Sequence, residues 1–154
     1  MLTKDERDEI LAELQHYPDK QAVVPEALKI VQRHRRWVSD EAVQDIAELL
    51  DMSAEQIDSI ATFYNLIFRQ PVGRHVILLC DSVSCWIMGY QNMLDCLSSR
   101  LGIGFGETTP DGRFTLLPMV CLGACDHAPA MMVDHDLHGD LTVEKIEEIL
   151  ATYV

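Results

Sequence analysis

Apolar residues recur every three or four positions through the first sixty residues, which is the spacing of helices with one buried face. The predicted helices cover Lys4–Tyr17, a segment from about Val24 to Arg36 with Pro25 in its first turn, Asp40–Leu50, and a segment capped by Ser53 that ends by Phe63. Because only short loops separate these helices, the first part of the chain is predicted to be a compact helical bundle.

The pattern changes at Gln70–Gly73, after which short apolar runs of strand length alternate with helical spacing. The predicted elements are a strand at His75–Leu79, a helix from about Trp86 to Leu101, strands at Glu107–Thr109 and Arg113–Val120 around a turn at Pro110–Gly112, a strand at Ala130–Val133, and a closing helix capped by Thr142. We therefore predict two domains, residues 1–72 and 73–154, the second of order βαββ(β)α.

Four of the five cysteines form two close pairs, Cys80 with Cys85 and Cys121 with Cys125. Each pair begins where a predicted strand ends. If the two strands are parallel neighbours, their carboxyl ends bring both pairs to the same edge of the sheet, where four thiolates would converge. The fifth, Cys96, has no partner in the sequence and is predicted to lie in the core.

The pairs have the spacings C-x4-C and C-x3-C, which are wider than the C-x2-C knuckles usual at structural zinc. These wider loops favour a 2Fe-2S cluster, although four cysteines also suit zinc. Gly123 would let backbone N–H groups approach the sulfurs, and Cys85 lies at a predicted helix N-terminus. The alternatives are buried cysteines that only fill space, and a dithiol of the thioredoxin type, which requires the absent C-x-x-C motif.

The net charge of −13 argues against nucleic acid and anionic membrane surfaces, and favours a basic or mixed protein surface as neighbour. The basic run at Arg33, Arg35 and Arg36 is interpreted as a solvated helix end. The longest apolar runs are far shorter than the roughly 20 residues of a membrane span, and the acidic N-terminus differs from a transit peptide. We expect no direct membrane insertion and a protein that stays in the compartment where it is made.

Several segments together resemble the thioredoxin-like 2Fe-2S subunit of bacterial NADH-quinone oxidoreductase, respiratory complex I. The likeness covers nearly the whole chain. The segments that carry it are Glu26–Gln32, Ala61–Tyr64, Phe68–Val76, Cys80–Cys85, Asp111–Leu116 and Cys121–Cys125. Small departures follow the second cysteine, at Trp86–Met88, and precede the third, at Met119–Val120.

The resemblance implies an α+β protein, in which an N-terminal helical bundle precedes a thioredoxin-like 2Fe-2S ferredoxin domain with a mixed sheet. It implies that Cys80, Cys85, Cys121 and Cys125 bind one 2Fe-2S cluster, and that FMN and NADH bind to a partner subunit rather than to this chain. The chain is then a non-catalytic electron-transfer subunit. It would lie with other peripheral-arm subunits on the cytoplasmic side of the inner membrane.

Three other interpretations stay open at this point. Related modules serve NAD-linked hydrogenases and NAD-dependent formate dehydrogenases, and their copurifying subunits would distinguish them. A zinc-stabilised interaction module would be colourless. A stand-alone ferredoxin that diffuses between partners would have no use for the helical bundle.

Overall fold

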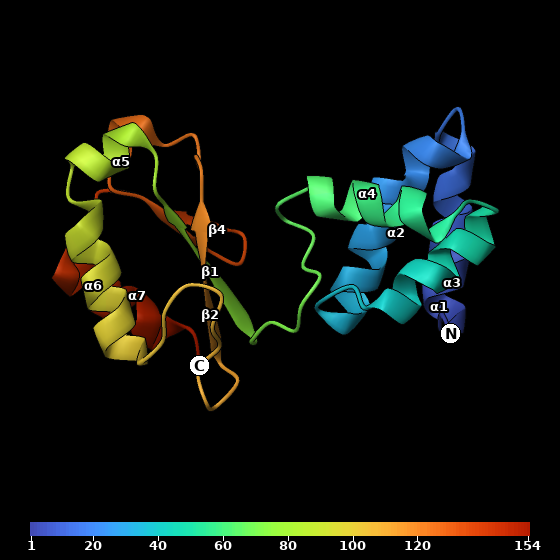
Figure 1. Cartoon of the computed structure of the whole chain (residues 1–154). Coiled ribbons are helices and arrows are strands. Elements are labelled where there is room, and N and C mark those ends of the chain that lie inside the picture. Colours follow the sequence, from blue (N-terminus) through green and yellow to red (C-terminus); the bar gives the residue numbers. More distant parts are fainter. The chain divides into compact units, whose positions relative to one another are not determined.

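The computed structural model describes all residues, 1–154, and divides into two compact units, Met1–Pro71 and Val72–Val154 (Figure 1). Each unit has a hydrophobic core of its own. The division falls beside the predicted domain boundary, but the independence of the two units as domains stays a prediction. No helix of the protein combines the length and apolar character needed to cross a membrane.

The first unit is helical, as the periodicity predicts. It contains α1 (Lys4–Glu13), the 3₁₀ helix η1 (Leu14–His16), α2 (Lys20–Arg35), α3 (Asp40–Leu50) and α4 (Ala54–Phe63). Thr3 and Ser53 begin α1 and α4 with complete capping boxes, which satisfy N–H groups that have no partner within the helix. The apolar stripes of α2 and α3 form most of the core.

Two features of this unit differ from the sequence prediction. Helix α2 begins at Lys20, where the Asp19 side chain accepts a hydrogen bond from the backbone N–H of Ala22, so Pro25 lies in the second turn rather than the first. The basic helix end is not simply solvated, because Arg35 pairs with the buried carboxylate of Glu6 through two hydrogen bonds of 2.6 Å. The periodicity of one helix does not reveal a partner on another.

The second unit contains a four-stranded mixed sheet in the order β2-β1-β3-β4. Its elements are β1 (His75–Cys80), α5 (Val83–Ile87), α6 (Tyr90–Leu101), β2 (Phe114–Met119), the 3₁₀ helix η2 (Cys125–His127), β3 (Met131–Val133), β4 (Asp136–His138) and α7 (Val143–Thr152). Strands β1 and β2 are parallel, whereas β3 is antiparallel to both β1 and β4. Helices α6 and α7 lie side by side, and their apolar residues share one core with the sheet (Figure 1).

The elements predicted for this unit require three corrections. The helix predicted from Trp86 to Leu101 is two helices, because Gly89, with φ of 110°, interrupts it between α5 and α6. Glu107–Thr109 is not a strand, since only Thr108 forms an isolated bridge, with Thr115. Strand β4 has no counterpart among the predicted elements; its ladder with β3 forms across Asp134, which has a positive φ. The predicted turn at Pro110–Gly112 is present, with Gly112 at a φ of 67°.

Candidate metal centre

The first cysteine pair lies in the interior of the second unit. Cys80 is the last residue of β1, and Cys85 is in the short helix α5 that follows. Their exposed fractions are 3% and 2%, and they form a small buried cluster with Ala124, Ala128 and Ala130. Strand β1 ends and the chain turns into α5 within two residues, so both sulfurs are held by regular, well-packed backbone.

The second pair is exposed to solvent. Cys121 follows the end of β2 by two residues, and Cys125 begins η2. Gly123, between them, has a φ of 76°, a conformation that glycine adopts without strain, and its backbone N–H donates a hydrogen bond of 3.3 Å to the Cys121 sulfur. The loop therefore already directs one N–H group at a sulfur, as its glycine predicted.

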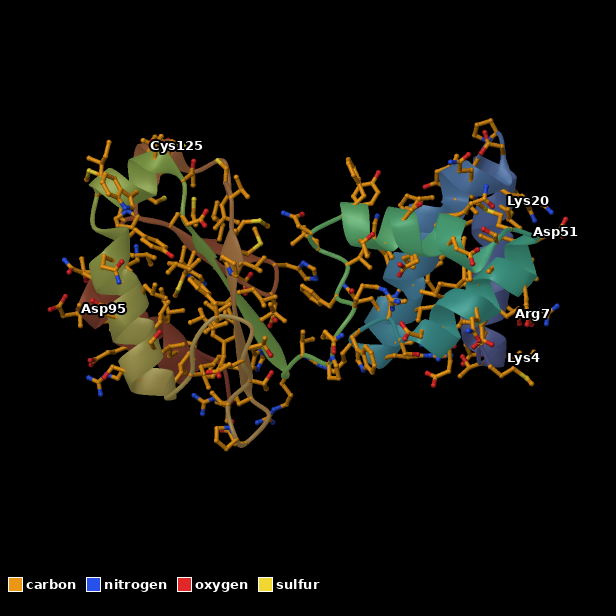
Figure 2. All side chains as sticks on the ribbon, in the orientation of Figure 1. Lys4, Arg7, Lys20, Asp51, Asp95 and Cys125 are labelled. Carbon is orange, nitrogen blue, oxygen red and sulfur yellow. The ribbon has the colours of Figure 1, made fainter.

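The parallel pairing of β1 and β2 brings the two cysteine pairs to the same edge of the sheet. Cys80 is in register with Met119, and the next residue, Asp81, donates its backbone N–H to the Met119 carbonyl over 2.9 Å. On the other side, the Cys80 N–H donates to the Ala130 carbonyl over 3.1 Å, so the end of β1 is held from both sides. Figure 2 shows Cys125 beside α5, which contains Cys85. The parallel pairing on which the predicted convergence depends is confirmed, whereas the convergence of the four sulfurs stays a prediction.

The four sulfurs have the chemistry of an iron-sulfur ligand set. All five cysteines are free thiols. Burial, followed by a hydrogen bond with Cys80, raises the pKa of the Cys85 thiol to about 11, and a smaller contribution comes from Cys125. A metal that binds such a thiol must replace its proton. Four cysteines at one edge, two of them buried and two accessible, fit a 2Fe-2S cluster.

No group of three or more His, Cys, Asp and Glu side chains surrounds a point at which one metal ion could bind. The assignment of the four cysteines as ligands therefore rests on the strand topology and the donor chemistry, and it stays a prediction. Cys96 lies apart in α6, half-buried against the main core of the unit, where core packing was expected.

Exposed apolar residues adjoin both cysteine pairs along the chain, and the sequence did not predict their exposure. Large apolar side chains that are at least 60% exposed flank both pairs, and we call them the apolar rim: Val83, Trp86, Ile87, Met88 and Val120. A short helix with apolar residues at nearly every position could have indicated this surface, because one core can cover only one face of such a helix. From the sequence, Trp86–Met88 and Val120 look only like small departures from the family pattern.

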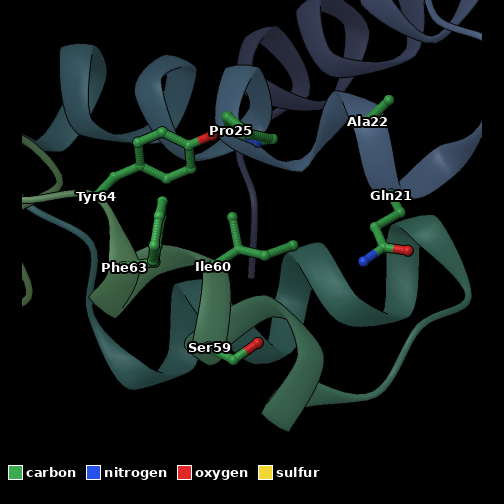
Figure 3. Close-up of a pocket in the computed structure, with 7 residues that line it drawn as sticks. All are labelled: Gln21, Ala22, Pro25, Ser59, Ile60, Phe63 and Tyr64. Carbon is green, nitrogen blue, oxygen red and sulfur yellow. The ribbon is translucent and has the colours of Figure 1, made fainter.

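A cavity of about 410 Å³ in the helical unit is a different kind of site (Figure 3). Its lining residues are Gln21, Ala22, Pro25, Ser59, Ile60, Phe63 and Tyr64. Without a cysteine, histidine or carboxylate, it offers none of the ligands that hold an iron-sulfur cluster or a structural zinc ion. The candidate metal centre therefore lies in the second unit alone.

Comparison with known proteins agrees with this geometry. The model of the thioredoxin-like [2Fe-2S] ferredoxin family matches residues 10–154. This chain belongs to that family.

Relatives that match along nearly their full length are subunits of one kind of enzyme. The chain is 50% identical over 154 residues to a subunit of the NADH-quinone oxidoreductase of Pseudomonas aeruginosa, and the match covers 100% of this chain and 93% of the relative. It is 53% identical over 152 residues to the like-named subunit of Escherichia coli K12. That match covers 99% of this chain and 92% of the relative. The resemblance predicted from the sequence is confirmed.

A solved structure shows the same fold. An NAD⁺-reducing [NiFe]-hydrogenase in the air-oxidised state matches with a TM-score of 0.71 and 22% identity. The match covers 82% of this chain but only 22% of the hydrogenase chain. At this identity the likeness supports the thioredoxin-like fold and no more.

Proposed function

We propose that this chain is the one-electron carrier subunit of an NADH-quinone oxidoreductase, respiratory complex I. Cys80, Cys85, Cys121 and Cys125 bind its single 2Fe-2S cluster. The observation that carries the proposal is the parallel pairing of β1 and β2, which brings two cysteine pairs to one edge of the sheet. When bound, such a cluster accepts and releases one electron. Full-length relatives at 50% and 53% identity support this assignment over the hydrogenase module, which shares the fold at 22% identity.

The two cysteine pairs contribute different things to the site. Cys80 and Cys85 bind from the buried side, where Ala124, Ala128 and Ala130 exclude water. Cys121 and Cys125 complete the ligand set from the solvent side. Exclusion of water and N–H groups near sulfur both set the reduction potential of a cluster, and the Gly123 N–H is such a donor.

The flavin and nicotinamide chemistry belongs to a partner. NADH and FMN bind to another subunit of the complex, and this chain receives electrons there without a catalytic side chain of its own. The apolar rim is the surface that docks on that subunit. Exposed Trp, Met and branched aliphatic side chains around a site have the composition of an interface core. With this docking, the chain lies in the peripheral arm, on the cytoplasmic side of the inner membrane.

Electron transfer can be tested with the partner subunit. The chain is coexpressed with the FMN-binding subunit from the same organism, purified without oxygen, and treated with NADH. We expect the two to co-elute, and NADH to produce the EPR signal of a reduced 2Fe-2S cluster in the complex but not in this chain alone. If NADH reduces no cluster in the complex, the proposal is wrong.

Docking can be tested with two matched substitutions. Trp86→Asp places a charge in the apolar rim, whereas Leu137→Asp places the same charge at another exposed apolar residue, on β4. The rim variant should bind the FMN-binding subunit at least about tenfold more weakly, as expected for a central aromatic residue of an interface. The β4 variant should bind normally, and visible absorption should show that both retain the cluster. Equal binding by both variants would contradict the docking surface.

A further inference from the structure

Helix η2, which begins with Cys125, is tied to the segment that precedes α7. The Nδ1 of His127 donates a hydrogen bond of 2.8 Å to the Asp140 carboxylate, which can only accept. In return, the Asp140 backbone N–H donates to the His127 carbonyl over 2.6 Å. His127 and Asp140 are thus joined through both side chain and backbone. His127 lies two positions beyond Cys125, the last cysteine of the candidate centre.

Gly139 lets the two segments approach this closely. A Cβ atom at this position would lie 2.5 Å from the Cβ of His127 and 2.8 Å from its carbonyl oxygen. The His127 carbonyl oxygen belongs to the backbone, and the His127 Cβ is bonded directly to it. A side chain at position 139 would therefore force η2 to move. The Lys145 ammonium donates to the Gly139 carbonyl from α7 and holds the other side of this segment. We call His127, Gly139 and Asp140 the clasp.

The clasp connects an exposed loop to the rigid part of the unit. Leu141, next to Asp140, is 4% exposed and belongs to the main core, and its N–H donates to the Pro129 carbonyl over 3.1 Å. Thr142 then caps α7. The loop that contains Cys121 and Cys125 has no strand or long helix of its own, so its position depends on contacts of this kind.

The two cysteine pairs differ in this need. Cys80 and Cys85 are held by β1, α5 and the packing around them, and require no additional contact. Cys125 is exposed, and its own helix η2 is only three residues long. A ligand on such a short turn can move unless something outside the turn fixes it.

We propose that His127, Gly139 and Asp140 are positioning residues that hold Cys125 at the metal centre. They act through the backbone of η2 and bind no metal themselves. This inference rests on the proposed function, in which Cys125 is a cluster ligand. It does not depend on the charge of His127, because Nδ1 carries a hydrogen in the protonated ring and in one tautomer of the neutral ring.

The test compares three substitutions of His127. His127→Ala and His127→Phe both remove the donor, and Phe keeps a planar ring in place. His127→Asn keeps a side-chain N–H group near the position of Nδ1 and is the conservative variant. Asp126→Ala is the matched control, because it removes a neighbouring charge in the same turn without removing a hydrogen bond of the clasp.

Each full-length protein is purified without oxygen, and the loss of visible absorption is followed in excess iron chelator. We expect the Ala and Phe variants to lose the cluster about tenfold faster than the unsubstituted protein, since a hydrogen bond to a charged group is lost. Their reduced EPR lines should also broaden, because Cys125 then occupies several positions. The Asn and Asp126 variants should behave like the unsubstituted protein, and circular dichroism should show the same fold in all of them.

Each outcome has a distinct meaning. If the unsubstituted protein binds no cluster, both the proposed function and the role of the clasp are wrong. If it binds a cluster and the Ala and Phe variants lose it no faster and give the same EPR spectrum, only the clasp is wrong. If the Ala variant fails to fold, the Phe variant, which retains the ring, decides the question by the same readouts.

Discussion

The helical unit and the sheet unit divide stability and chemistry between them. Met1–Pro71 contains no cysteine, and one continuous core joins its four α-helices. Val72–Val154 contains all five cysteines, and beside its main core it has a second, smaller cluster of buried residues around Cys80 and Cys85. The only buried carboxylate of the first unit, Glu6, forms an ion pair with Arg35, whereas the buried thiols of the second unit lie at the proposed metal centre.

This difference shows that residues close together in the sequence determine the first unit, whereas residues far apart determine the proposed site of the second. The helices of the first unit arise from residues a few positions apart, so periodicity and capping residues determine them. The proposed metal centre of the second unit depends on Cys80 and Cys121, which are far apart in the sequence and which only the pairing of β1 with β2 brings to one edge of the sheet. Substitutions that affect one unit and spare the other test this division.

The largest effect is expected in the sheet unit, at the cysteines. Cys85→Ser should abolish cluster binding, because one thiolate of the ligand set is lost. Cys96→Ser is the matched control, a half-buried cysteine in α6 outside the proposed centre, and it should retain the cluster. Iron content per chain and visible absorption measure both. A cluster of normal content in the Cys85 variant would break the assignment.

The next effect belongs to the helical unit. Arg35→Ala leaves Glu6, whose side chain is 1% exposed, buried without its partner, and should lower the free energy of unfolding by about 3–5 kcal/mol. Arg33→Ala breaks the exposed pair with Glu9 and should cost less than about 1 kcal/mol. Denaturant unfolding followed by circular dichroism gives both values. Similar losses in the two variants would mean that burial does not distinguish these pairs.

Acid should weaken the same ion pair. The hydrogen bond from Arg35 lowers the pKa of Glu6 from 4.5 to about 2. A carboxyl whose pKa is lower in the folded state stabilises the protein at pH values above its unfolded-state pKa. This contribution is lost as the pH falls through its folded-state pKa. About 3 kcal/mol should therefore be lost between pH 4.5 and pH 2. Glu6→Gln should show less pH dependence in this window, and an unchanged slope would contradict the account.

The smallest effect concerns a helix terminus. Ser53→Ala removes the capping box of α4 and should destabilise the helical unit by about 1 kcal/mol. Ser59→Ala, in the same helix, removes only a hydroxyl that donates to the Gln56 carbonyl, and should change stability by less than about 0.5 kcal/mol. Thermal unfolding measures the difference. Cluster content should be the same in both variants.

Features that depend on local pattern could be predicted from the sequence. They are the four helices of the first unit, strand β1, the turn at Pro110–Gly112, and the position of each cysteine pair near the end of a strand. The family and the thioredoxin-like fold followed from segments in a specific order. The ligand roles of the four cysteines remain a prediction, because neither the topology nor the comparisons observe a metal bond.

Features that were not predicted depend on contacts between distant segments or on a single backbone angle. The partner of Arg35 lies on another helix, so the basic run looked solvated. The break at Gly89 requires a positive φ that an apolar pattern does not reveal. The clasp was not predicted because position 139 requires glycine only through its close contact with His127. That residue is distant in the sequence and lies beside Gly139 in the fold.

The most direct test of the central claim is a count of iron, acid-labile sulfide and zinc in protein purified without oxygen, combined with EPR before and after dithionite. The account predicts about two iron and two sulfide per chain, no zinc, and a signal that appears on reduction and integrates to about one spin. A colourless protein with one zinc per chain and no signal would contradict the electron-carrier function, even if the same four cysteines bound that zinc.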